Sequence, residues 1–167
     1  MDGVRIKANH RQIVRCLRAL LVVMPLSVQA ATTVTVKVTI VAPPPCVING
    51  NRTIEVNFGE VMTTRVDGKN YRVPVSYSLS CSGQSKNAMK LQVQGTGAAF
   101  DTSALKTTKT GLGIQLQQGS SNLALNSWLN FTYPNTPELW AVPVKQSGVT
   151  LSGGEFTAGA TMKVAYQ

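Results

Sequence analysis

Cysteine is the residue type with the most readily predicted chemistry in this 167-residue chain, which contains three of them. Cys16 lies in an N-terminal stretch with the features of an export signal, which leaves Cys46 and Cys81 as an even pair. Two thiols about 35 residues apart in an exported protein favour one disulfide, which would stabilise the fold by roughly 3–4 kcal/mol through loop-closure entropy. A metal site is disfavoured, because the only histidine, His10, also lies in the N-terminal stretch.

The acidic side chains do not indicate catalysis. All six that follow the N-terminal stretch are isolated in sequence and lie beside turns or strand edges: Glu55, Glu60, Asp67, Asp101, Glu138 and Glu155. No pair of them marks itself as an acid and base couple, and no histidine follows residue 30. The sequence therefore disfavours an enzyme and implies no cofactor.

The first 30 residues have the organisation of a secretory signal. A basic region is followed by a short apolar run, 19–28, which is too short to span a membrane. The small residues around Ala30 match a cleavage pattern, so we expect cleavage between Ala30 and Ala31. The alternative is a short membrane anchor.

Removal of this signal changes the interpretation of the charge. Five of the 16 Lys and Arg residues and one of the 7 Asp and Glu residues precede the expected cut, which leaves 11 and 6 and a net charge of +5. The remaining basic residues are scattered, with no run that would follow a phosphate backbone. The sequence therefore predicts no nucleic-acid partner.

Everything after Cys46 indicates short strands separated by turns, without a useful helical period. Alternation of apolar and polar residues predicts strands at 53–58, 71–81, 89–94, 113–118, 123–125, 139–144 and 156–167. Pro74 favours either an edge position for the second of these strands or a bulge near its start. Regularly spaced short strands predict an all-β, immunoglobulin-like sandwich with one core. The stretch 126–137 is expected to be an ordered loop packed by its own aromatic residues. Core or loop packing of Trp128 and Trp140 is favoured over a sugar-stacking surface.

An alternating segment precedes this domain, at 33–40. Its four β-branched apolar side chains share one face: Val34, Val36, Val38 and Ile40. Three consecutive prolines, 43–45, follow; they cannot donate ladder hydrogen bonds and favour a stiff, extended chain. The segment therefore cannot return through a tight hairpin, and we expect it to fill a groove elsewhere.

The C-terminal segment is a second strand that needs a partner. Its apolar residues alternate up to the penultimate position, in the order Ala160, Met162, Val164 and Tyr166. An apolar strand that reaches the last residues must be tied down, and a partner can pair with it and capture the carboxylate of Gln167.

These features together resemble a pilus subunit of the chaperone–usher pathway of Gram-negative bacteria. The resemblance covers the whole chain after the signal: the alternating extension, the two cysteines, Gly154 at the fourteenth position from the end and Tyr166 at the penultimate position. It implies an incomplete immunoglobulin-like sandwich that lacks its final strand, with an N-terminal donor-strand extension. The implied divisions are 1–30 signal peptide, 31–45 donor-strand extension and 46–167 pilin domain.

The resemblance also implies the partners. A periplasmic pilus chaperone would lend a strand to the open groove, and an outer-membrane usher would assemble the fibre at the cell surface. The chaperone and groove contacts would come from the C-terminal region, through Gly154, Ala160, Met162, Val164, Tyr166 and Gln167. In the fibre, the donor residues of the next subunit would replace the chaperone in a head-to-tail polymer of neighbouring pilus subunits.

The extension departs from the family pattern in one respect. Such extensions usually carry a glycine partway along the strand, whereas no residue from Thr32 to Ala42 is glycine. Either this strand docks in a roomier groove, or its register differs. The missing glycine, the small share of aromatic residues and the triple proline together favour a minor or adaptor subunit over a major rod subunit, with a terminator as a further alternative. A receptor-binding adhesin and a complete secreted immunoglobulin-like binding module are the alternatives.

Overall fold

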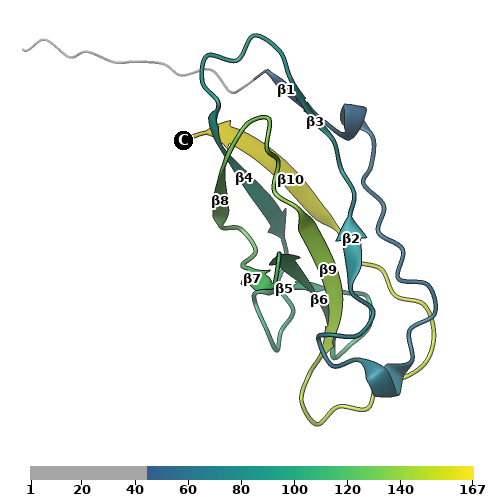
Figure 1. Cartoon of the computed structure of the whole chain (residues 1–167). Coiled ribbons are helices and arrows are strands. Elements are labelled where there is room, and N and C mark those ends of the chain that lie inside the picture. The colour runs from purple at the N-terminus through teal and green to yellow at the C-terminus, as the bar shows by residue number, and fades with distance from the viewer. Residues whose placement is uncertain (1–44) are drawn as a thin grey trace, which may run out of the picture. The chain divides into compact units, whose positions relative to one another are not determined.

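The computed structural model describes residues 45–167, and these form an all-β domain (Figure 1). The helical segments in this range are two 3₁₀ turns, η1 (Asn49–Asn51) and η2 (Thr63–Arg65). The strands are β1 (Cys46–Ile48), β2 (Val73–Val75), β3 (Leu79–Cys81), β4 (Ala88–Gly95), β5 (Ala104–Lys106), β6 (Leu112–Gln118), β7 (Ser121–Leu123), β8 (Trp128–Thr132), β9 (Leu139–Lys145) and β10 (Ala160–Tyr166). Nothing in the described range forms a helix that is long and apolar enough to cross a membrane.

One sheet has three antiparallel strands in the order β10-β4-β8. β10 pairs with β4 along the whole length of β10, from Tyr166 opposite Met89 to Ala160 opposite Gly95. On its other side β4 pairs with β8, where Gln92 lies opposite Trp128. β10 and β8 are therefore the two edges of this sheet.

The second sheet has the order β2-β9-β6-β5, with β7 paired to β6. β2 is an edge strand, which confirms the position predicted from Pro74, because a proline without an N–H is tolerated there. Pro143 lies inside β9, opposite Ile114 of β6. The pairing of β9 with β2 ends at Ala141, so Pro143 lies beyond it.

The hydrophobic core lies between these two sheets. Its buried members come from both of them and from the turns between strands: Met89, Leu91, Val93, Leu105, Ile114, Leu116, Leu123, Leu125, Phe131, Leu139 and Ala141. Each strand contributes alternate residues, because successive side chains of a strand point to opposite faces. A third, two-stranded sheet, β1 with β3, lies beside this core.

The predicted strand 71–81 is in fact two strands. β2 pairs with β9, whereas β3 pairs with β1, so the run passes from one sheet to another. Val75, Tyr77 and Leu79 nevertheless remain half-buried against the core along the whole run. The alternation therefore identified the buried face correctly but not the change of partner.

The prediction of a loop at 126–137 is wrong, because β8 occupies 128–132. Leu129 and Phe131 point to the core, whereas Asn130 between them and the residues on either side are exposed, which is ordinary strand alternation. The tryptophan, tyrosine and prolines of this stretch concealed that pattern. Trp128 is exposed rather than packed inside, contrary to expectation.

Candidate binding groove

An apolar groove of about 570 Å³ opens between the chain that follows η1 and the chain that forms β10. Core residues of both sheets form its floor: Val75, Val93, Leu105, Ile114, Leu116, Leu139 and Ala141. One border carries Ile54, Val56 and Phe58, and the other carries Phe156, Ala160 and Met162. The groove therefore exposes part of the hydrophobic core between two segments of chain.

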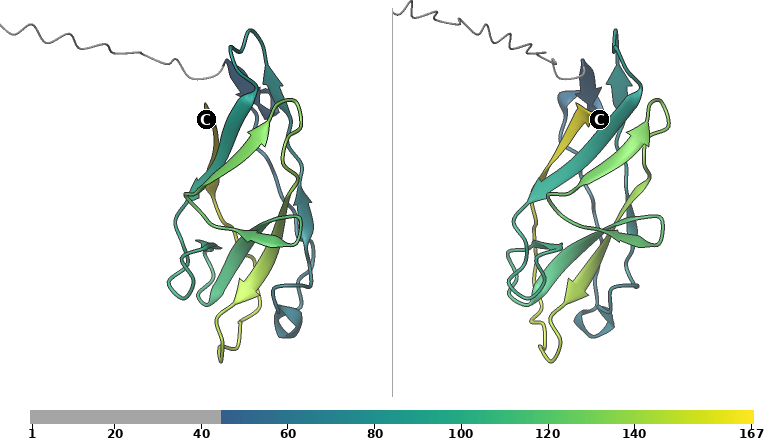
Figure 2. Two further views of the ribbon diagram at one scale, coloured as in Figure 1. Left: turned by 60° about the vertical axis from the view of Figure 1, so that its left-hand side comes forward. Right: turned by 90° about the vertical axis from the view of Figure 1, so that its left-hand side faces the viewer.

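The first border is the segment 53–58, which was predicted to be a strand. It has the alternation of a strand, with Ile54, Val56 and Phe58 half-buried and the residues between them exposed. It is nevertheless assigned to no strand, and both views of Figure 2 draw it as a plain tube between η1 and η2. The predicted strand is absent because no described segment pairs with this one.

A left-handed turn brings the chain from β1 into this border. The φ angles of Asn49, Gly50 and Asn51 are all positive, at 48°, 61° and 60°, a region that glycine and asparagine tolerate best. The Asn49 side chain holds the turn, because its Nδ2 donates to the carbonyl oxygens of Arg52 (3.1 Å) and Thr53 (3.0 Å). The turn ends the pairing with β3 and starts the unpaired border.

The second border is β10, which pairs with β4 on one side and with no described strand on the other. Ala160 and Met162 line the groove, and Val164 and Tyr166 pack against the core further along the strand. Met162, Val164 and Tyr166 are only half-buried, although their position is that of core residues. Both borders thus present unpaired backbone and half-covered apolar side chains, which is the environment that an inserted strand would complete.

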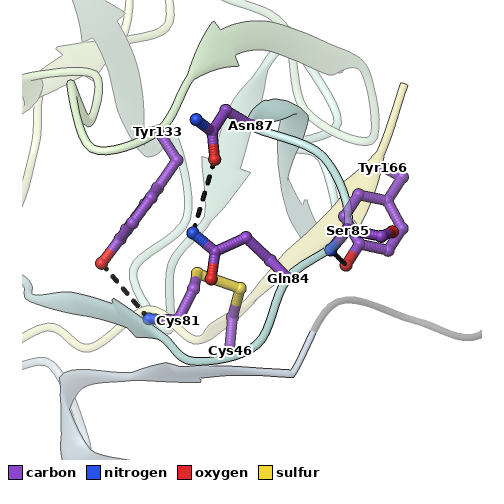
Figure 3. Close-up of a disulfide and its surroundings, with 7 residues drawn as sticks. All are labelled: Cys46, Cys81, Gln84, Ser85, Asn87, Tyr133 and Tyr166. Carbon is purple, nitrogen blue, oxygen red and sulfur yellow. Dashed lines mark hydrogen bonds between the residues drawn. A yellow bond between two sulfur atoms is a disulfide. The ribbon is translucent and has the colours of Figure 1, made fainter.

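The disulfide lies where β1 meets β3 (Figure 3). Cys46 and Cys81 are directly opposite each other in that ladder and are bonded, which confirms the predicted pair. The Tyr133 hydroxyl accepts a hydrogen bond from the Cys81 amide at 3.4 Å.

The end of β10 is held beside the loop that follows Cys81. The Tyr166 hydroxyl accepts from the Ser85 amide at 3.2 Å (Figure 3). Gln167 Nε2 donates to the carbonyl oxygens of Met89 (2.7 Å) and Phe131 (3.2 Å), and thereby connects the end of β10 to both other strands of its sheet. The C-terminal strand is therefore fixed at the end that follows its groove-lining residues.

The structure brings only some of the sequence-predicted site residues together. Ala160 and Met162 line the groove, whereas Tyr166 and Gln167 are used in the contacts at the strand end. Gly154 lies outside the groove in the loop before β10, with a φ of 108°. The donor residues Val34, Val36, Val38 and Ile40 and the cleavage residues Ala30 and Ala31 lie outside the described residues.

Sequence reasoning did not assign the first border to the groove. The alternation of Ile54, Val56 and Phe58 was visible, but nothing local shows that a strand lacks a partner. Within residues 45–167 no cluster of His, Cys, Asp and Glu could hold a metal ion. The groove is lined mainly by aliphatic and aromatic side chains, so its chemistry is that of binding an apolar strand.

Comparisons with known proteins agree on one family. The fimbrial protein family model matches residues 33–167, which include both the described domain and the alternating segment before it. The uncharacterized fimbrial-like protein YfcR of Escherichia coli (strain K12) is 40% identical over 136 residues, 78% of each chain. The fimbrial adapter PapF of Escherichia coli is 31% identical over 136 residues, 74% of this chain and 81% of PapF. A solved structure of the P pilus adaptor subunit PapF matches with a TM-score of 0.57 and 28% identity, over 75% of this chain and 98% of that one.

Proposed function

Because the chain belongs to the fimbrial protein family, we propose that it is an adaptor-type subunit of a chaperone–usher fimbria and polymerises by donor-strand exchange. The observation that carries the proposal is the apolar groove between the unpaired segment 53–58 and the free edge of β10. A strand inserted there would pair with backbone on both sides and cover the core beneath it.

The alternating segment of the extension suits this groove in length and in chemistry. Its apolar residues run from Val34 to Ile40, seven residues that span about 20 Å as a strand. β10, from Ala160 to Tyr166, also has seven residues. Burial of four Val and Ile side chains would contribute roughly 6–12 kcal/mol as an upper estimate. That is comparable with the whole net stability of a domain, about 5–15 kcal/mol.

The open groove also explains why such a subunit needs partners. Free strand edges favour aggregation, so a periplasmic chaperone would fill the groove until an outer-membrane usher adds the subunit to the fibre. Since each subunit then completes another one, the contact is heterologous and does not close, which generates a filament. The role is structural rather than catalytic, and the protein acts at the cell surface.

The division of the chain follows from this role. Residues 1–30 would direct export and be removed, 31–45 would form the donor-strand extension, and 46–167 the domain that receives a strand. Val34, Val36, Val38 and Ile40 donate, while Ala160 and Met162 belong to the accepting groove.

Thermal unfolding of a self-completed variant tests whether the domain lacks a strand. Residues 32–42 are appended after Gln167 through a flexible linker, and the variant is compared with residues 31–167. We expect the midpoint to rise by tens of degrees and oligomers to disappear, because about 6–12 kcal/mol of burial is added. An unchanged midpoint would mean that the domain is already complete, and would favour a secreted binding module.

Fibre assembly tests the donor face directly. Val36→Asp together with Val38→Asp places two charges in the apolar groove, and assembly should be lost. The matched control is Thr35→Asp with Thr39→Asp, which adds the same charge to the opposite face of the same segment and should still assemble. Equal assembly by both double variants would exclude this segment as the donor.

A further inference from the structure

The outward face of the three-stranded sheet carries an ordered row of polar and aromatic side chains. Lys163 lies opposite Gln92, and Gln92 lies opposite Trp128, so one row crosses β10, β4 and β8. Directly opposed residues of a sheet point to the same side, and in the neighbouring row Lys90 lies opposite Asn130. This face is the reverse of the one that packs on the core, so it stays accessible whether or not the groove is filled.

Trp128 is the exposed tryptophan of the domain. Its exposed fraction is 44%, although an indole ring is normally buried at least on one face. The described domain's other tryptophan, Trp140, is covered, because the Arg72 guanidinium lies 3.9 Å from its ring centroid. That guanidinium is fixed by hydrogen bonds to Gln117 and to the Gly119 carbonyl oxygen. The cation over the Trp128 ring is the Lys90 ammonium, 5.1 Å from its centroid.

A largely buried glutamine, Gln92, lies directly opposite Trp128 in the sheet. Gln92 is only 6% exposed, and its Nε2 donates to the carbonyl oxygen of Asn126 at 2.5 Å. This bond fixes the amide group. Every buried side-chain oxygen of the described residues has a hydrogen-bond partner, and Gln92 Oε1 takes part in none of their hydrogen bonds, so this oxygen faces solvent. Gln92 Oε1 is therefore a preset acceptor for a hydroxyl or amide group that comes from outside.

The charge of this face has one sign. Lys163 belongs to the row and Lys90 to the neighbouring row, and none of the residues of β4, β8 and β10 is acidic. An anionic group is therefore the complementary partner.

We propose that the outward face of the β10-β4-β8 sheet binds an acidic oligosaccharide. The Trp128 ring stacks on the C–H face of one sugar, as aromatic rings do with flat, weakly polar groups. A sugar hydroxyl donates to Gln92 Oε1, and Lys163 and Lys90 bind a carboxylate of the saccharide. An acidic peptide would use the two lysines but offers neither the stacking face nor the row of hydroxyl groups.

The test is direct binding of trigalacturonate to the purified, exported protein, followed by calorimetry at low salt. We expect saturable binding that weakens as salt increases, and binding about two- to fivefold weaker for the neutral methyl ester of the same trisaccharide. Trp128→Ala should weaken binding of both saccharides about tenfold or more. Trp128→Phe should retain part of the affinity, because a smaller ring still stacks.

Two lysine variants distinguish binding at the proposed site from a general attraction of the anion to the protein's positive charge. Lys163→Gln should weaken binding of the acid about two- to fivefold and leave the neutral ester unaffected. Lys106→Gln removes the same charge from an exposed position of β5, in the other sheet, and should change neither affinity. Binding that Trp128→Ala leaves unchanged, or no saturable binding at millimolar saccharide, would overturn the proposal. Equal affinity for hexaglutamate would overturn it too, and would assign the face to an acidic protein partner.

Discussion

Phe58 and Phe156 meet at one end of the groove, with their ring centroids 5.9 Å apart and their planes tilted by 39°. Phe58 belongs to the unpaired border 53–58, and Phe156 belongs to the chain that leads into β10. The two borders thus touch at this end, while the groove separates the rest of them. This aromatic contact holds an otherwise unpaired segment against the domain.

Loss of that contact should loosen the border. Phe156→Ala removes the ring and its packing, and we expect the free energy of unfolding to fall by about 2–3 kcal/mol, less than for a fully buried phenylalanine. Urea denaturation of the variant measures this. Glu155→Ala changes the exposed neighbour and should leave stability nearly unchanged. A variant as stable as the wild type would show that the border is held by other contacts.

The disulfide should contribute mainly through the unfolded state. Cys46→Ser with Cys81→Ser frees a loop with a sequence separation of 35, which should lower the free energy of unfolding by about 3–4 kcal/mol. Because an open-groove domain has little stability to spare, we expect this double variant to be unfolded at 37 °C unless a strand fills the groove. The appended-strand form of the same double variant provides the control, and should be folded. Equal midpoints for the oxidised and the double-serine forms would contradict the prediction.

Local patterns predicted which residues of the domain are buried better than which strands pair. The stretches 89–94, 113–118 and 139–144 are confirmed as strands, since alternation records the two faces of a strand. The short strands β1 and β5 were not predicted, because three residues carry no recognisable period.

The groove exists because the segment 53–58 pairs with no other described strand. Ile54, Val56 and Phe58 have the alternation of a strand, yet whether they pair depends on chain that lies far away in the sequence or in another molecule. The same dependence on distant segments explains why the row on the outward face of the β10-β4-β8 sheet was not predicted. The row joins β10, β4 and β8, and only the register places Lys163, Gln92 and Trp128 side by side.

Gly154 should be required for its backbone conformation rather than for contact with a partner. Its φ of 108° is strained for any residue with a Cβ atom, although the only atom near that Cβ position is Lys109 Nζ at 3.6 Å. Gly154→Ala should therefore lower the free energy of unfolding by about 1–3 kcal/mol. Gly153→Ala is a matched control, because the adjacent position has open space and no such φ. Equal stability of the two variants in urea would contradict this explanation.

The Tyr77 hydroxyl should make stability depend on alkaline pH. Burial raises its pKa to about 12 from 10.0, and the hydroxyl donates to the Pro137 carbonyl oxygen at 2.7 Å. Since the folded state favours the neutral phenol, its contribution is fully present below pH 10. It is lost as the pH rises from 10 towards 12, where the unfolded chain ionises first.

Tyr77→Phe isolates that effect. The variant loses one partly buried hydrogen bond, so at pH 8 we expect it to be less stable by about 1 kcal/mol. Between pH 10 and 11 its stability should fall less steeply than that of the wild type, because phenylalanine does not ionise. Urea denaturation at intervals of pH compares the two slopes, and identical slopes would show that the Tyr77 phenol does not ionise differently in the folded and unfolded chains.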